Sequence, residues 1–95
     1  MAGYVIAQMT VTDPEAFADY PGQAGATVDA FGGRYVVRGG AMEKMEGDWD
    51  PGRVVIIEFD SVEQARAWYD SRIYEEAKAL RIRSTVSSLM IVEGA

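Results

Sequence analysis

The chain has 95 residues, which is enough for one domain over 1–95 and too few for two. It is 48% hydrophobic and 25% charged, a composition typical of globular proteins and not of disordered ones. Its net charge of −6 argues against binding to nucleic acid or to an anionic membrane surface, because both need a basic face.

Two residue types are missing from the chain, which has no Cys and no His. Disulfides, thiolate or imidazole metal sites and a Ser–His–Asp triad are therefore excluded. Glu43, Glu46, Asp48 and Asp50 lie close together in sequence, but their spacing fits no EF-hand and favours a solvated loop. We expect neither a metal site nor a cofactor. No leader or membrane-length apolar run is present, so we expect a cytoplasmic protein.

The first third of the chain predicts a strand followed by a helix. Tyr4–Val11 is rich in strand-forming residues and apolar on both faces, as in the middle of a sheet. Asp13 is a helix cap, and apolar residues then recur at helical spacing over Pro14–Phe31. Pro21-Gly22 interrupts this pattern without shifting it, so we predict one helix kinked there. Gly32-Gly33 is expected to end it, with one glycine in the left-handed conformation.

Two strands are predicted in the middle of the chain. Arg34–Arg38 alternates as a strand, and Gly39-Gly40 is expected to weaken or bulge it before a continuation over Ala41–Met45. The segment 47–52 is the strongest turn signal in the sequence, because it holds two Gly, two Asp and one Pro. Arg53–Phe59 follows as a strand that is apolar apart from its first residue and Glu58.

The last third predicts a broken helix and a final strand. Ser61 caps a helix, with Gln64 in the reciprocal capping-box position. Asp70-Ser71 breaks the helical pattern, which then resumes over residues 73–80. Thr85–Val92 is the last strand.

The element order is β-α-β-β-α-β, which predicts a ferredoxin-like α+β fold. Right-handed crossovers place the strands in the order 4-1-3-2 in an antiparallel sheet, with the helices on one face. The other face lacks a cover although the central strands are apolar on both sides. We expect a second copy to pack on it, sheet against sheet, as a homodimer.

Several blocks of the sequence occur together in one known family. They include Thr12-Asp13-Pro14-Glu15, Gly32-Gly33-Arg34-Tyr35, Glu46-Gly47-Asp48-Trp49, the strand 53–59, Trp68-Tyr69-Asp70-Ser71, Tyr74, Arg81 and Val92-Glu93-Gly94. In this combination the chain resembles, over nearly its whole length, the bacterial family called domain of unknown function 1330. The resemblance implies a dimeric α/β barrel and no known reaction. Pro21-Gly22 departs from the family pattern and puts the straightness of the first helix in doubt.

Arg34 and Arg38 are the first candidates for ligand binding. They lie four residues apart on one strand, so we expect both side chains on the same face. Two guanidinium groups there could hold a carboxylate or stabilise an oxyanion. Alternatively, each simply pairs with Glu58, with a neighbouring acid or with a dimer partner.

Glu58 is the candidate catalytic residue. It is the only charged residue after Arg53 in a strand expected to be central and buried, so it should be either ion-paired or protonated. An ion-paired Glu58 is a structural anchor. A protonated one could act as general acid or base.

Four aromatic side chains, Tyr20, Trp68, Tyr69 and Tyr74, lie on the predicted helices. Aromatic residues at helical spacing most often form core, but here they could also wall a cleft for a flat organic ligand. Ser71 and Arg81 could line the edge of that cleft. Ser71 has no His to activate it and is interpreted as a cap or hydrogen-bond donor.

Three functions remain open from the sequence. The first is a cofactor-independent enzyme acting on a small aromatic or keto-acid-like metabolite, with arginines binding the anionic group and Glu58 moving a proton. The second is a non-catalytic binder of a small organic acid. The third is a purely structural dimer. The analogy of fold behind the first is a weak basis for a function, so whether the protein is an enzyme stays open.

Overall fold

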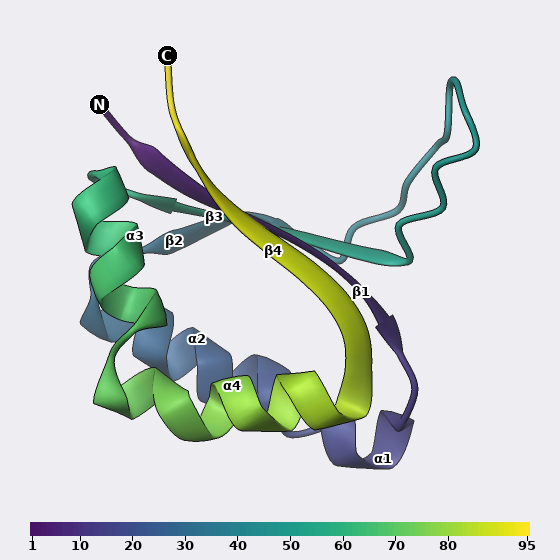
Figure 1. The fold of residues 1–95 in the computed structure, drawn as a ribbon, viewed down its shortest axis with the longest axis horizontal. Coiled ribbons are helices and arrows are strands. Elements are labelled where there is room, and N and C mark those ends of the chain that lie inside the picture. Colours follow the sequence, from purple (N-terminus) through teal and green to yellow (C-terminus); the bar gives the residue numbers. More distant parts are fainter.

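The computed structural model describes residues 1–95 as a four-stranded antiparallel sheet with helices on one face (Figure 1). In chain order the elements are β1 (Gly3–Val11), α1 (Pro14–Phe17), α2 (Tyr20–Ala30), β2 (Arg34–Arg38), β3 (Arg53–Phe59), α3 (Val62–Tyr69), α4 (Arg72–Ser84) and β4 (Thr85–Glu93). The strands lie in the order β2-β3-β1-β4, and every neighbouring pair is antiparallel. The predicted ferredoxin-like fold and strand order are confirmed.

The sheet divides the chain into a helix-covered face and an open face. In β1, Val5, Ala7 and Met9 are buried beneath the helices, and their counterparts in β3 are Val55 and Ile57. Because successive strand side chains point to opposite sides, the residues between them face away from the helices. The hydrophobic core therefore lies between the sheet and the helices, as expected.

The open face carries exposed apolar side chains. Val86 and Met90 of the edge strand β4 are 71% and 58% exposed, and Ile6 and Ile56 of the central strands are only partly buried. No element of the chain covers this face, although the segment 39–52 projects away from the body at one end of it (Figure 1).

The prediction of one kinked helix over 14–31 is wrong, because the structure has two helices there. Helix α1 ends at Phe17, and α2 begins at Tyr20 with Pro21 in its first turn. In that turn the missing N–H of proline has no helical partner to lose, so Pro21 favours a helix start over a kink. Gly32, with φ of +72°, ends α2 as predicted.

Strand β2 also differs from its prediction. Its bulge lies between Tyr35 and Val37, earlier than Gly39-Gly40, and the strand ends at Arg38 with no continuation over Ala41–Met45. Gly39 adopts a φ of +68° and the Arg53 guanidinium packs against it, so a side chain there would be both strained and crowded. The chain consequently leaves the sheet at Gly39.

The predicted caps of the second half are present. The Ser61 Oγ accepts a hydrogen bond from the Gln64 N–H at 3.0 Å, but the Gln64 side chain donates to the Phe31 carbonyl rather than closing the reciprocal box. The Ser71 Oγ accepts from the Tyr74 N–H at 3.2 Å and donates to the Trp68 carbonyl, which makes it the cap of α4. No helix has the length and apolar character needed to cross a bilayer.

Candidate functional site

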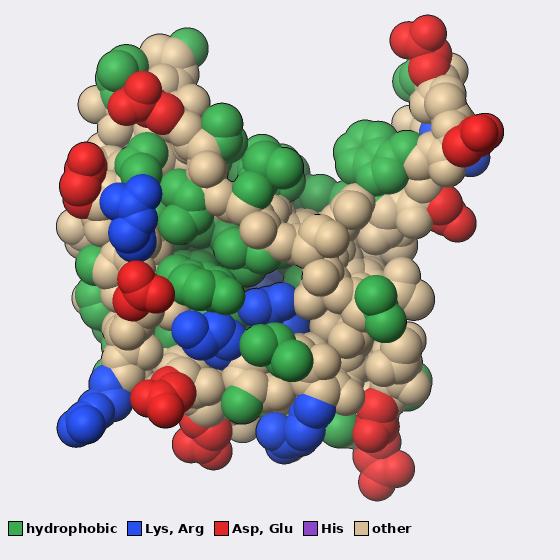
Figure 2. All heavy atoms as spheres, viewed as in Figure 1, with side chains coloured by type: hydrophobic (Ala, Val, Ile, Leu, Met, Phe, Trp, Pro, Cys, Tyr) green, Lys and Arg blue, Asp and Glu red, His purple; other side chains and the backbone are tan.

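A cleft between the helix-covered face of the sheet and the helices is the candidate site. Figure 2 shows a hollow on this side of the molecule, with basic side chains inside it and acidic ones around its rim and on the projecting loop. An inner cavity of about 20 Å³ is lined by Val5, Ala7, Met9, Tyr20, Pro21, Tyr35, Arg38, Arg53, Val55, Ile57, Trp68 and Leu89. A space of this size accommodates about one water-sized group.

An outer groove of about 460 Å³ lies between α4 and β4 along the β4 edge of the sheet. Its lining is half polar and includes Tyr69, Arg81, Thr85 and Ser87. Leu89 lines both the cavity and the groove. The groove is large enough for a small organic molecule, whereas the cavity alone is not.

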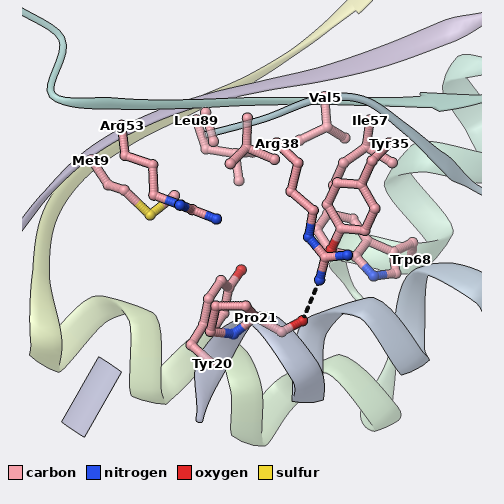
Figure 3. Close-up of a pocket in the computed structure, with 12 residues that line it drawn as sticks. Val5, Met9, Tyr20, Pro21, Tyr35, Arg38, Arg53, Ile57, Trp68 and Leu89 are labelled. Carbon is pink, nitrogen blue, oxygen red and sulfur yellow. Dashed lines mark hydrogen bonds between the residues drawn. The ribbon is translucent and has the colours of Figure 1, made fainter. Parts of the chain in front are cut away.

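Three arginines at the cleft have no acidic partner. Of the seven arginines in the chain, only Arg34 has a carboxylate within 4.0 Å. Arg38 stacks over the Tyr35 ring at 4.1 Å and donates to the Pro21 carbonyl, as Figure 3 shows, and Arg53 points into the same space. Arg81 is only 4% exposed, and no Asp or Glu lines the cavity or the groove. The cleft is a positive region in a protein whose net charge is −6.

Hydrogen bonds connect Arg81 to two tyrosines inside the cleft. Its Nε donates to the Tyr74 hydroxyl at 3.4 Å, and its Nη1 donates to the Ser87 Oγ at 2.6 Å. The hydroxyls of Tyr74 and Tyr20 are 2.7 Å apart. Burial raises the pKa of Tyr20 well above its ordinary value, and the nearby Tyr74 hydroxyl adds to this effect. Tyr20 therefore stays protonated and acts as a hydrogen-bond donor or acceptor, not as a base.

The same side of the cleft is walled by packed aromatic rings. The centroids of Trp68 and Tyr74 are 4.1 Å apart, and both residues are almost fully buried. The Trp68 indole N–H donates to the Thr27 Oγ1 at 2.9 Å, which satisfies its only polar atom. Burial also raises the pKa of Tyr35, with Arg38 opposing the effect. These contacts fix the position of Trp68, whose ring forms part of the apolar lining of the inner cavity.

The structure brings together most of the residues that the sequence singled out. Tyr20 and Trp68 line the inner cavity, and Tyr69 and Arg81 line the outer groove. The Tyr74 hydroxyl is hydrogen-bonded to both Tyr20 and Arg81. Ser71 lies at neither space and caps α4.

The prediction that Arg34 and Arg38 share a face is wrong. The bulge between Tyr35 and Val37 adds one residue to β2 and reverses the alternation of its side chains. Arg38 consequently turns to the cleft, whereas Arg34 lies on the open face.

Glu58 is also on the open face and away from the cleft. Its Oε1 is 3.1 Å from the Arg34 Nε, and its Oε2 is 3.4 Å from the Tyr4 hydroxyl. Arg34 is also 3.8 Å from Asp60. The structure thus shows Glu58 in the ion-paired state, one of the two alternatives that the sequence left open.

Sequence reasoning overlooked Arg53 and Tyr35, which both line the inner cavity. A signal for Arg53 was present, because it lies two and four residues before the apolar Val55 and Ile57 and so shares their face. Tyr35 gave no comparable signal, because its neighbour in the cleft, Arg38, is on the same side only through the bulge.

The projecting loop is attached to the opposite face. The Trp49 indole N–H donates to the Gln8 Oε1 at 2.8 Å, and an apolar groove of about 500 Å³ lies between Trp49 and the open face. No group of acidic side chains in the chain is arranged to hold a metal ion. The Trp49–Gln8 hydrogen bond thus connects the projecting loop to β1 on the open face.

Comparison with known proteins places the chain in a family. The model described as Domain of unknown function (DUF1330) matches residues 2–95. The chain belongs to this family. The resemblance found in the sequence is thereby confirmed. No curated protein matches this DUF1330 chain.

Solved structures share the fold of the DUF1330 chain. A protein of unknown function from Rhodopseudomonas palustris superposes with a TM-score of 0.74 at 21% identity, covering 99% of this chain and 82% of its own. SnoaB, a cofactor-independent oxygenase from Streptomyces nogalater, gives 0.70 at 11% identity, covering 99% and 93%. An ethyl tert-butyl ether d (ethd) family protein from Bacillus halodurans gives 0.63 at 13% identity over 100% of both chains. At these identities the likeness establishes the fold alone.

Proposed function

We propose that this protein binds a small organic anion in the cleft between its sheet and its helices. The observation that carries the proposal is the presence of Arg38, Arg53 and Arg81 at one cleft without a single carboxylate. Unpaired guanidinium groups beside apolar walls repel one another, and a ligand carboxylate or oxyanion relieves that repulsion through charge-assisted hydrogen bonds. The aromatic wall favours a ligand with a flat body, such as an aromatic or keto acid.

Isothermal titration calorimetry with aromatic acids, keto acids and their uncharged amides tests this proposal. We expect the acids to bind and the amides to bind at least about tenfold more weakly, because an interaction with a charged group contributes about 1.5–3 kcal/mol. Arg53→Gln should weaken acid binding by a similar factor. Arg34→Gln is the matched control, since it removes a guanidinium from the other face. Equal binding of acid and amide would contradict the proposal.

Catalysis on such a ligand is the second candidate function. It is favoured by the direct contact of Tyr20, Tyr74 and Arg81 inside the cleft, and one protein of similar fold is a cofactor-independent oxygenase. Glu58 lies on the far side of the sheet from the cleft of its own subunit, so within the cleft Tyr20 is the better candidate for a neutral hydrogen-bonding group that stabilises charge on the ligand. Mass spectrometry of a bound acid after incubation separates the two candidates. Recovery of unchanged compound favours binding alone, and a new product favours an enzyme.

We further propose that two copies pair through their open sheet faces. The support is a set of apolar side chains on the open face, Ile6, Ile56, Val86 and Met90, that no element of the subunit covers. A two-fold axis brings the same surface of both copies together, so one charged substitution places two charges in the interface. Met90→Lys should raise the dimer dissociation constant at least about tenfold, measured by sedimentation, since burying an unpaired charge is costly. A wild-type monomer at all concentrations would contradict the pairing.

A further inference from the structure

The hydrogen bonds among Arg81, Tyr74 and Tyr20 have a fixed direction. A guanidinium only donates, so the Tyr74 oxygen must accept the Arg81 Nε–H. The Tyr74 side chain is fully buried, and the only other side-chain oxygen bonded to its hydroxyl is that of Tyr20, at 2.7 Å. Because a buried hydroxyl proton needs an acceptor, Tyr74 donates to Tyr20. The hydroxyl proton of Tyr20 therefore has no acceptor within the tyrosine pair and points away from Tyr74.

Tyr20 directs that proton into the inner cavity. Its hydroxyl reaches from α2 toward the sheet, into the space that Arg53 and Arg38 enter from the opposite side (Figure 3). A hydroxyl that already accepts a hydrogen bond from a chain ending in a cation is a stronger donor than an isolated one. The other tyrosine at the cavity, Tyr35, is uncharged near neutral pH, because burial raises its pKa. Arg38, Arg53 and the Tyr20 hydroxyl thus all favour a negatively charged oxygen in the inner cavity.

The size of the cavity limits what that oxygen can belong to. A volume of about 20 Å³ has room for about one oxygen-sized group beside the Tyr20 hydroxyl. The outer groove of about 460 Å³ has room for the body of the ligand. We propose that Tyr20, positioned by Tyr74 and Arg81, donates a hydrogen bond to a single anionic oxygen, so that the cleft selects the ionised form of a phenol or an enol. This inference rests on the proposed function and names its ligand class.

A coloured phenol tests the inference directly. Para-nitrophenol absorbs differently as phenol and as phenolate, so its apparent pKa can be measured while it is bound to the intact protein. We expect the bound probe to ionise about one pH unit below the free probe, which corresponds to a tenfold preference for the phenolate. Tyr20→Phe should remove most of this shift and Tyr74→Phe part of it. Tyr4→Phe is the matched control, because it removes a hydroxyl on the open face.

The outcomes separate this inference from the proposed function. Calorimetry with para-nitrobenzoate serves as the parallel measurement, and thermal melts verify that each variant is folded. If para-nitrobenzoate binds while para-nitrophenol does not bind or ionises as in free solution, the selection of a phenolate or enolate is overturned and anion binding stands. An unchanged shift in a folded Tyr20→Phe variant also overturns it. If neither probe binds at millimolar concentration, the proposed function fails together with the inference.

Discussion

On the helix-covered side of the sheet, Arg38, Arg53 and Arg81 lie without a carboxylate, whereas on the open side Arg34 contacts both Glu58 and Asp60. On the open side two carboxylates outweigh the single guanidinium, which leaves no positive charge to attract an anion. The helix-covered side keeps its positive charge in a chain of net charge −6. Arginines of one short strand, β2, take part in both arrangements, so the function of an arginine here depends on the face it reaches.

The two faces also differ in how they treat polar groups. In the cleft, the Trp68 N–H and the Tyr74 hydroxyl are buried and each has a partner within the chain. On the open face, the Trp49 indole is held by Gln8 but remains mostly exposed. We expect polar substitutions on the cleft side to destabilise the subunit and similar substitutions on the open side to act mainly on association.

The largest difference in the free energy of unfolding is expected between alanine variants of the two tryptophans. Trp68 is 1% exposed and Trp49 is 63% exposed. Trp68→Ala should lower the free energy of unfolding by about 3–5 kcal/mol, because it opens a cavity in the core, and this approaches the whole stability of a small domain. Trp49→Ala should change it by less than about 1 kcal/mol. Urea unfolding followed by circular dichroism measures both, and equal losses would contradict the division into two faces.

A smaller difference in the loss of unfolding free energy is expected between variants that disrupt two polar contacts, one on each face. Thr27→Val removes the acceptor of the Trp68 N–H and should cost about 1–3 kcal/mol, because that donor is sealed from water. Glu58→Gln weakens an ion pair whose arginine is 55% exposed, and such surface pairs contribute only about 0–1 kcal/mol. Urea unfolding of both variants provides the comparison. A loss for Glu58→Gln as large as that for Thr27→Val would show that the open face is sealed in solution.

The smallest expected effect is a dependence on alkaline pH. Burial raises the pKa of Tyr20 and of Tyr35 above the ordinary value of 10.0. Above about pH 10 the unfolded chain therefore releases these protons first, so stability present at neutral pH is lost as the pH rises. Urea midpoints measured across this range should fall, and they should fall less steeply in Tyr20→Phe. An identical slope in the variant would mean that Tyr20 does not contribute.

Local sequence was sufficient for the elements and for most of the aromatic wall. Asp13, Ser61 and Ser71 cap helices where the pattern predicted, because a cap depends only on the few residues beside it. The kink predicted at Pro21 was wrong, because a proline within an apolar helical periodicity is compatible with both a kink and a helix start. Which of the two occurs depends on how α1 and α2 pack.

Amino-acid sequence by itself determined the βαββαβ order, the apolar faces that β1, β3 and the helices bury and the absence of His and Cys chemistry. These features follow from residue type and from periodicities along one stretch of chain. Only the tertiary structure decided which arginines meet the cleft and that Tyr20 contacts Tyr74 and Arg81. A single bulge residue in β2 reverses the facing of Arg38, and the tyrosine pair joins residues 54 positions apart. Both outcomes depend on pairing and packing between distant segments, which no local pattern in the chain encodes.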